Sequence, residues 1–175
     1  MFFQVVRGGL IVLLVAAALW DICRHRIPNA LNGAVLLTGL ATAVESGGWE
    51  QAGSGLGAAL LCLAVLWWPW LTRRIGGGDV KLTAAAASSV GLTQVHEYLL
   101  GTALLVGMLA LVCYGLSNLR ARRQIASNMA LMTLGILPEA PLHGGNGRVS
   151  VPFGVAAALS GLIIVLLGEG VLHWL

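Results

Sequence analysis

Long apolar segments dominate the chain, and short polar stretches separate them. Six such segments can be distinguished: about Phe2–Trp20, Leu31–Val44, Ala52–Leu71, Asp79–Leu92, Tyr98–Ser117 and Val151–Leu167. A helix that crosses a bilayer needs about 20 apolar residues, so several of these segments have the length of a membrane span. The pattern predicts an all-α fold, a polytopic transmembrane helical bundle with about six spans.

The composition supports a membrane protein and excludes a water-soluble globule. Apolar residues make up 58% of the 175 residues and charged residues only 10%, whereas soluble domains have about 45–50% and about 25%. We therefore expect residues 1–175 to form a single integral-membrane domain with one long loop at about 118–150. An active site in such a chain has to be built from helix ends and loops.

The basic residues indicate the orientation in the membrane. With six spans, one side carries nine of the ten basic residues: Arg24, Arg26, Arg73, Arg74, Lys81, Arg120, Arg122, Arg123 and Arg148. The other side carries only Arg7. The positive-inside rule makes the basic side cytoplasmic and places both termini outside. The net charge of +3 follows from this rule, and we expect no nucleic-acid partner. A cleaved signal peptide ending near residues 16–18 is a weaker alternative, because cleavage would move Arg24 to the outside face.

The cysteines offer no metal site or disulfide framework. Cys23, Cys62 and Cys113 form no CxxC pair, and Cys62 and Cys113 lie in apolar segments. Such cysteines are typical of small buried apolar residues. His143 lies alone in a glycine-rich stretch, without the second ligand that a metal site needs. We expect neither a metal nor an organic cofactor.

Two aspartates stand out among the seven acidic residues. Asp21 closes the first apolar segment and Asp79 opens the fourth, both on the basic side. An ionisable group at membrane depth costs about 2.5–3.5 kcal/mol at a helix centre, so it indicates function. Two helix-end residues in contact with water are the simpler alternative. The remaining acidic residues have the positions of solvated charges in loops or at span ends: Glu45, Glu50, Glu97, Glu139 and Glu169.

The surroundings of both aspartates are unusual. Asp79 follows Gly76, Gly77 and Gly78, and its apolar segment of 14 residues would span only about 21 Å as a helix. Either the helix continues to Val95, or the glycine loop enters the membrane beside water. Small residues fill this segment, which predicts a central helix that packs closely on its neighbours. After Asp21, the proline at position 28 favours an immediate turn into an antiparallel second helix.

These residues together resemble the prepilin peptidases, membrane aspartic proteases of the GxGD type. The resemblance rests on Asp21 with the following Ile27-Pro28-Asn29, and on Gly76-Gly77-Gly78-Asp79-Val80-Lys81. A third match, Val151-Pro152-Phe153-Gly154, resembles the start of the family's last helix. Since the chain lacks the paired CxxC motifs of the longer, methylating members, it is most similar to the short tight-adherence (Flp) type. The family often has a larger residue where Gly77 stands.

The resemblance implies an enzyme that cleaves the basic leader peptide from prepilins at the cytoplasmic face of the inner membrane. Asp21 and Asp79 would be catalytic, the three glycines an active-site loop, and Lys81 a contact for an acidic substrate residue. Lys81 reaching the interface as a surface charge is an equal alternative. Because a helix N-terminus favours an anion and a C-terminus disfavours it, we expect Asp79 as the base and Asp21 as the acid.

Two other functions remain open at this point. A transporter or assembly scaffold could use the two aspartates as a proton relay, although the chain shows no inverted repeat. A related intramembrane protease could apply the same chemistry to another substrate. The sequence does not indicate which prepilin is cut, or the oligomeric state.

Overall fold

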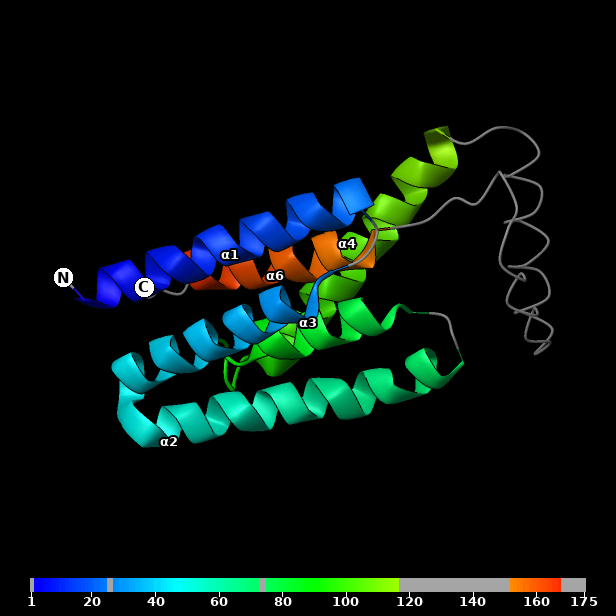
Figure 1. The fold of residues 1–175 in the computed structure, drawn as a ribbon. Coiled ribbons are helices and arrows are strands. Elements are labelled where there is room, and N and C mark those ends of the chain that lie inside the picture. The colour runs from blue at the N-terminus through cyan, green and yellow to red at the C-terminus, as the bar shows by residue number, and fades with distance from the viewer. Residues whose placement is uncertain (1, 25–26, 73–74, 117–151, 168–175) are drawn as a thin grey trace.

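The described part of the protein is entirely helical. The computed structural model describes residues 2–24, 27–72, 75–116 and 152–167, and these ranges contain no strand. The helices are α1 (Phe2–Arg24), α2 (Asn29–Leu71), α3 (Gly77–Ala87), α4 (Val95–Leu116) and α6 (Phe153–Leu167) (Figure 1). The expected all-α class is confirmed. The expected loop at about 118–150 lies outside the described residues.

Helix α2 is a hairpin of two antiparallel arms. Its backbone leaves helical geometry at Gly47 and Gly48, where Gly48 has φ 68° and ψ −157°. Only glycine adopts this conformation at low cost, so the chain folds back at this point (Figure 1). The two arms correspond to the second and third apolar segments of the sequence.

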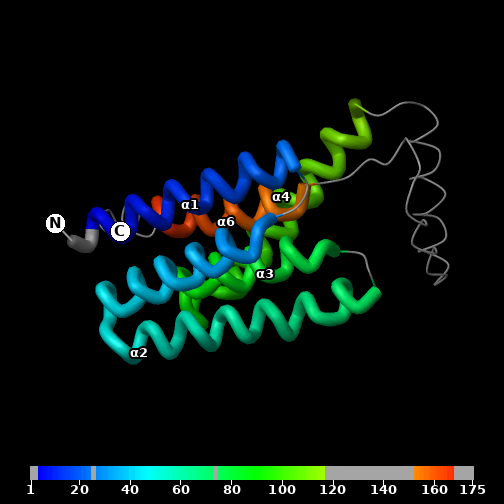
Figure 2. Tube along the Cα trace, in the orientation of Figure 1, coloured from blue at the N-terminus to red at the C-terminus, as the bar shows by residue number. Residues whose placement is uncertain are grey.

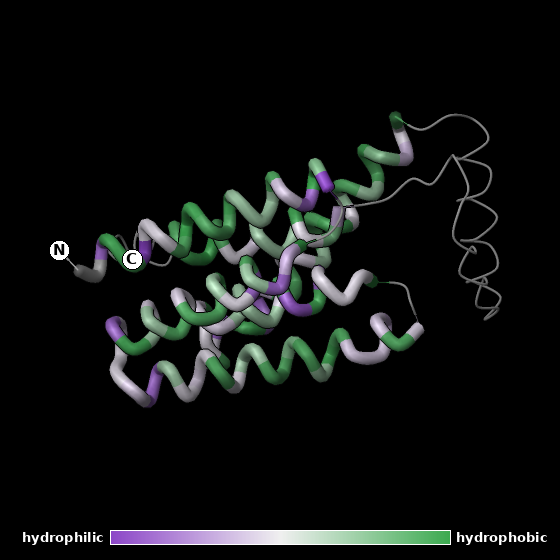
Figure 3. Tube along the Cα trace, viewed as in Figure 1, coloured by the Kyte–Doolittle hydropathy of each residue, from purple (hydrophilic) through white to green (hydrophobic). Residues whose placement is uncertain are grey.

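Within the described residues, three helices are long and apolar enough to cross a membrane: Gln4–Arg24, Asn29–Leu71 and Val95–Leu116. Helix α6 is apolar but shorter. Figure 3 shows apolar residues along most of each helix and polar residues mainly at helix ends and turns. The chain is therefore a membrane protein by length and composition of its helices, while the number of six spans stays a prediction.

The bundle has two ends that differ in chemistry. Helix α1 ends where α3 and α6 begin, and we call this the aspartate end because it contains Asp21 and Asp79 (Figure 2). Helix α1 begins where α6 ends and α2 folds back, and we call this the opposite end. Among the described basic residues, Arg24 and Lys81 lie at the aspartate end and Arg7 at the opposite end.

Helix α3 is the central helix, as its small residues predict. Seven of its eleven residues are buried, and it packs on α2 and α6. Its C-terminal end is held between the arms of α2, where neither Gly39 nor Gly55 leaves space for a Cβ atom beside Ser88. Such close approach of helices is what small residues allow in a membrane.

The end of α3 contradicts one of the two alternatives for this segment, a helix that continues to Val95. The helix ends at Ala87 and neither extends to Leu92 nor continues to Val95. The hydroxyl of Ser88 donates to the carbonyl of Ala85 at 2.7 Å, and Gly91 has φ 79°. The backbone N–H of Leu92 donates to Ser54 at 2.9 Å. The backbone N–H groups of Ser88, Ser89 and Val90 still donate to the carbonyls three residues earlier, so the helix ends in a tighter turn to which these side chains add hydrogen bonds.

The expected solvation of Glu45 is wrong. Both of its carboxylate oxygens are buried, and within the described residues neither has a hydrogen-bond partner. Three tryptophans lie at the end of α2. Trp67, Trp68 and Trp70 are exposed, as residues of an interfacial aromatic belt are, and the rings of Trp67 and Trp70 lie 5.1 Å apart.

Candidate active site

Asp21 lies in the last turn of α1 and is almost completely buried. Only 4% of its surface is exposed. Its Oδ2 atom accepts a hydrogen bond from the backbone N–H of Val155 at 3.1 Å. Val155 is in the first turn of α6, where backbone N–H groups lack helical partners. The N-terminus of α6 therefore holds the Asp21 carboxyl group in place.

Gly154 explains how α6 comes so close to Asp21. A Cβ atom at this position would lie 2.9 Å from Oδ2 of Asp21 and 2.7 Å from Cδ1 of Ile27. Both distances are too short for a carbon atom, so any larger residue displaces one of these side chains. Gly154 is thus required for the present position of the Asp21 carboxyl group.

Asp79 is the third residue of α3 and is half-buried. Gly76 precedes the helix, and a Cβ atom there would lie 2.9 Å from Oδ2 of Asp79. The carboxyl group thus lies over Gly76, whose missing side chain leaves the space for it. The carbonyl of Asp79 accepts a hydrogen bond from the hydroxyl of Thr83 at 2.8 Å.

The three glycines do not form the expected loop. Gly77 and Gly78 are the first residues of α3, and Gly76 is its N-cap. Among the described glycines only Gly48 and Gly91 have positive φ, so the glycine run is not needed for backbone conformation. Its role is close packing, since a Cβ atom at Gly77 would lie 3.1 Å from Nε1 of Trp70. Trp70 occupies the space that a larger residue at position 77 would need.

The segment from Ile27 to Asn32 connects the surroundings of the two aspartates. Ile27 packs against both Gly78 and Gly154: a Cβ atom at Gly78 would lie 3.4 Å from its backbone nitrogen. Asn32, which is 5% exposed, donates from Nδ2 to the carbonyl of Gly78 at 3.3 Å. The neighbours of Asp21 and of Asp79 therefore meet at one residue, and the structure brings the two aspartates to the same end of the bundle.

Lys81 is exposed and contacts the same connecting segment. Its Nζ atom donates a hydrogen bond to Oδ1 of Asn29 at 3.0 Å. An ammonium group carries three N–H donors, so this bond leaves Lys81 able to bind a second acceptor. The contact ties the first turns of α3 to the start of α2.

The helix dipoles do not decide which aspartate is the acid and which is the base. Asp21 lies near the C-terminus of α1, but its carboxyl group also lies at the N-terminus of α6. Asp79 lies at the N-terminus of its own helix. Since an N-terminus favours a negative charge in both cases, the dipoles do not distinguish the two aspartates.

Sequence reasoning did not find several residues of the site. The Val155 N–H group contacts Asp21, and Asn32 contacts Gly78, but the sequence did not single out either residue. Ile27 was part of the motif that follows Asp21, but its packing against Gly78 and Gly154 was not predicted. Pro152 directly precedes α6, and a proline is typical of the start of a helix. Within the described ranges, no three His, Cys, Asp or Glu residues are grouped as a metal site would require.

Comparison with known proteins agrees with the geometry. Residues 9–115 match the type IV leader peptidase family, a range that contains both aspartates and the glycine run. No curated protein and no solved structure matches the chain significantly. Since the family match covers more than half of the 175 residues, the chain belongs to the type IV leader peptidase family of peptidases.

Proposed function

We propose that this protein is a prepilin leader peptidase, an aspartic endopeptidase whose catalytic residues are Asp21 and Asp79. The observation that carries this proposal is the meeting of their surroundings at Ile27, where Gly78 and Gly154 both pack. The family membership supplies the peptidase chemistry. The substrate would be a prepilin, with a short basic leader followed by an apolar helix.

The chemistry follows from two carboxyl groups that share one proton. One ionised carboxylate takes a proton from a water molecule, and the hydroxide attacks the carbonyl carbon of the scissile peptide bond. The protonated carboxyl group then donates its proton to the leaving nitrogen as the C–N bond breaks. A new carboxylate and a new amino terminus result, and the two aspartates together still hold one proton. No metal or organic cofactor takes part.

The basic residues support a cytoplasmic position for this chemistry. Arg24 and Lys81 lie at the aspartate end, and by the positive-inside rule such basic residues favour a cytoplasmic position for that end. Membership of the leader peptidase family is consistent with the inner membrane of a cell. The absence of paired CxxC motifs in these 175 residues favours the short Flp type. Exposed Lys81 would attract an acidic residue beyond the cleavage point.

The proposal is tested by incubating the purified protein with a candidate prepilin and sequencing the product by mass spectrometry. We expect one new N-terminus directly after the basic leader. A transporter or scaffold would leave the precursor intact, and a protease with another substrate would cleave a different peptide from a panel of membrane-anchored substrates. Either result would remove prepilin cleavage as the function.

The orientation gives a separate prediction. A reporter fused after Ser117 is expected to lie in the cytoplasm. A reporter fused after the C-terminus is expected to lie on the outer side of the membrane. The reason is that a six-span chain places its basic residues on one face. Alkaline phosphatase and fluorescent-protein fusions measure this directly. A cytoplasmic reading at the C-terminus contradicts the six-span topology.

Asn32 gives a prediction about positioning. Asn32→Asp replaces the Nδ2 donor with an oxygen that faces the carbonyl of Gly78, so the start of α3 should move and Asp79 with it. We expect kcat for leader cleavage to fall about tenfold or more with little change in KM, since a hydrogen bond of this kind contributes about 1 kcal/mol and an unpaired acceptor costs more.

Thr38→Val is the matched control for Asn32→Asp. Thr38 lies on the same arm of α2, and its hydroxyl donates to Ala34 and Val35 of its own helix. We expect this variant to cleave at the wild-type rate. Equal rates for both variants would show that Asn32 does not position Asp79.

A further inference from the structure

Helix α6 carries the backbone N–H group that binds Asp21, so the place of α6 among the other helices decides where this carboxyl group lies. The residues that α6 buries are nearly all small: Gly154, Val155, Ala156, Ala157, Ala158, Ser160 and Gly161. Small side chains let helices approach closely, but they oppose sliding along a neighbour less than large interlocking side chains do. Further contacts are therefore needed to hold α6 at one level.

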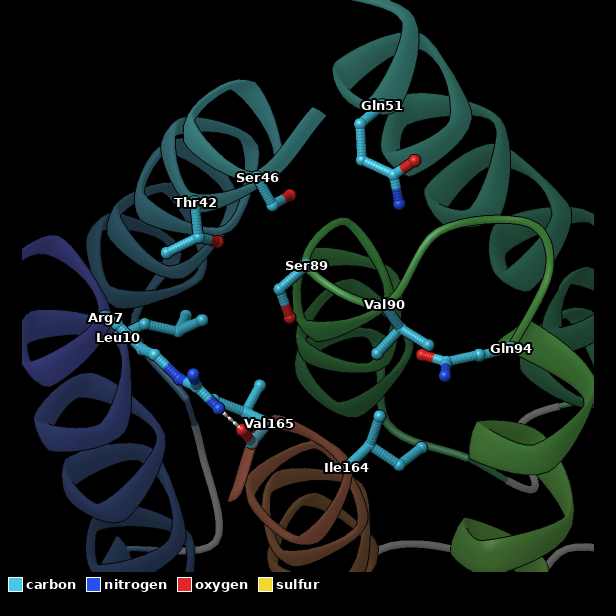
Figure 4. Close-up of a pocket in the computed structure, with 10 residues that line it drawn as sticks. All are labelled: Arg7, Leu10, Thr42, Ser46, Gln51, Ser89, Val90, Gln94, Ile164 and Val165. Carbon is cyan, nitrogen blue, oxygen red and sulfur yellow. Dashed lines mark hydrogen bonds between the residues drawn. The ribbon is translucent and has the colours of Figure 1, made fainter. Parts of the chain in front are cut away.

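A cavity separates the last described turns of α6 from α2. Ile164 and Val165 line this cavity of about 340 Å³, and Thr42 and Ser46 of α2 line its other side (Figure 4). Here α6 is held by α1, because the guanidinium group of Arg7 donates a hydrogen bond to the carbonyl of Val165 (Figure 4). Helix α1 thus binds α6 at both ends, through Arg7 beside the cavity and through Asp21 at the aspartate end.

Between these ends, two hydrogen bonds of opposite direction join α6 to α4. The hydroxyl of Tyr98 donates to the carbonyl of Ala157 at 3.3 Å, and the hydroxyl of Ser160 donates to the carbonyl of Tyr98 at 3.0 Å. Both side chains are buried, with 0% of Tyr98 and 3% of Ser160 exposed. Hydrogen bonds of this kind bind neighbouring helices in a membrane. Because the two bonds meet α6 about one turn apart, they limit its sliding along α4.

The shape of α4 agrees with this role. A Cβ atom at Gly101 would lie 2.7 Å from Oγ of Ser160, so a larger residue would displace this hydroxyl from the carbonyl of Tyr98. The residues that α4 buries are Val95, Tyr98 and Thr102, all near its start. Among the described helices α4 packs mainly on α6. The buried part of α4 is therefore the part that binds α6.

The contact with Tyr98 is close to the contact with Asp21. Ala157 follows Val155 by two residues, which is about 3 Å along the helix. We propose, on the basis of the peptidase function above, that Tyr98 and Ser160 are positioning residues for leader cleavage. They hold α6 in the register that the glycine contacts allow, and the N–H group of Val155 then holds the carboxyl group of Asp21.

Enzyme kinetics test this role. Tyr98→Phe and Ser160→Ala each remove one of the two hydrogen bonds and keep the size of the side chain nearly unchanged. Because the remaining bond still limits sliding, we expect kcat to fall only about threefold in each variant. The double variant should lose at least about 30-fold, more than the product of the single losses, with little change in KM. Two residues that stabilise the fold independently would give the product.

Two matched substitutions are the controls. Tyr114→Phe removes the same hydroxyl group from an exposed residue of α4, which is 37% exposed. Ser46→Ala removes a hydroxyl that donates to the carbonyl of Ala43 in its own helix. We expect both to cleave with the kcat of the wild type. A double-variant loss no larger than the product of the single losses, or a loss that appears in KM alone, would contradict the proposal.

A measurement without substrate reports the contact itself. The full chain, labelled with ¹⁵N-valine in detergent micelles, gives the amide proton resonance of Val155, and Asp21→Ala gives its position without the acceptor. We expect Tyr98→Phe and Ser160→Ala each to shift the resonance part of the way, and the double variant to shift it further. The two controls should not move it.

A Val155 resonance at the wild-type position in the double variant would overturn the proposal. The single variants decide the question in the same way if the double variant does not fold. Since this resonance needs no prepilin, it is independent of the cleavage assay. A wild-type chain that shows these shifts but cuts no prepilin would contradict the proposed function and leave the positioning of Asp21 by α4 supported.

Discussion

Asp21→Asn and Asp79→Asn are each expected to abolish leader cleavage while the protein still inserts and stays folded. Asparagine has nearly the same shape as aspartate but neither takes up nor releases a proton under these conditions. Acid–base catalysis by a positioned side chain contributes about 10²–10⁴-fold to the rate, so each variant should lose at least about 100-fold. The asparagine at position 21 can still accept the hydrogen bond from Val155, which preserves the local packing.

Precursor and product are separated on a gel, and size-exclusion chromatography in detergent checks the fold. Glu97→Gln is the matched control, since Glu97 is an exposed carboxylate at the start of α4. We expect it to cleave normally. Wild-type cleavage by either aspartate variant would mean that the two residues are not a catalytic pair.

Gly154→Ala is expected to lower cleavage about 100-fold with little loss of stability. The new Cβ atom would lie 2.9 Å from Oδ2 and 3.0 Å from Cγ of Asp21, so the carboxyl group has to move by several tenths of an ångström or more. Misplacement of a catalytic group by about 1 Å can cost about 100-fold in rate. A single methyl group thus acts on Asp21 without changing its chemistry.

Gly161→Ala on the same helix is the control, because its Cβ atom would meet Ala86 at 3.4 Å, an ordinary contact. A second variant identifies the cause of the loss. Ile27→Val removes the Cδ1 atom that would lie 2.7 Å from the new methyl group, so adding it to Gly154→Ala should recover part of the activity. Full activity of Gly154→Ala would show that Asp21 does not need its present position.

Some of the fold follows from the order of residues along the chain. Each apolar segment of the sequence contains a helix or an arm of one, and Gly47 and Gly48 mark the turn of α2. Asp79 lies in the first turn of α3, although the helix begins within the glycine run, at Gly77, and not after it. These features depend on hydropathy and on local backbone preferences, which a segment carries by itself. The motif around Asp79 also predicted the family.

The contacts that make the site came only from the tertiary structure. The N-terminus of α6 binds Asp21 across 134 positions of sequence, and this contact removed the basis for assigning Asp21 as the acid. Likewise Gly39, Gly55 and Ser54 of α2 surround the residues that follow the end of α3 at Ala87. Apolar helices rich in small residues can pack against one another in many registers. The hydropathy pattern of the sequence does not distinguish these registers. The close contacts at individual glycines decide which register forms, and they exist only once the helices are together.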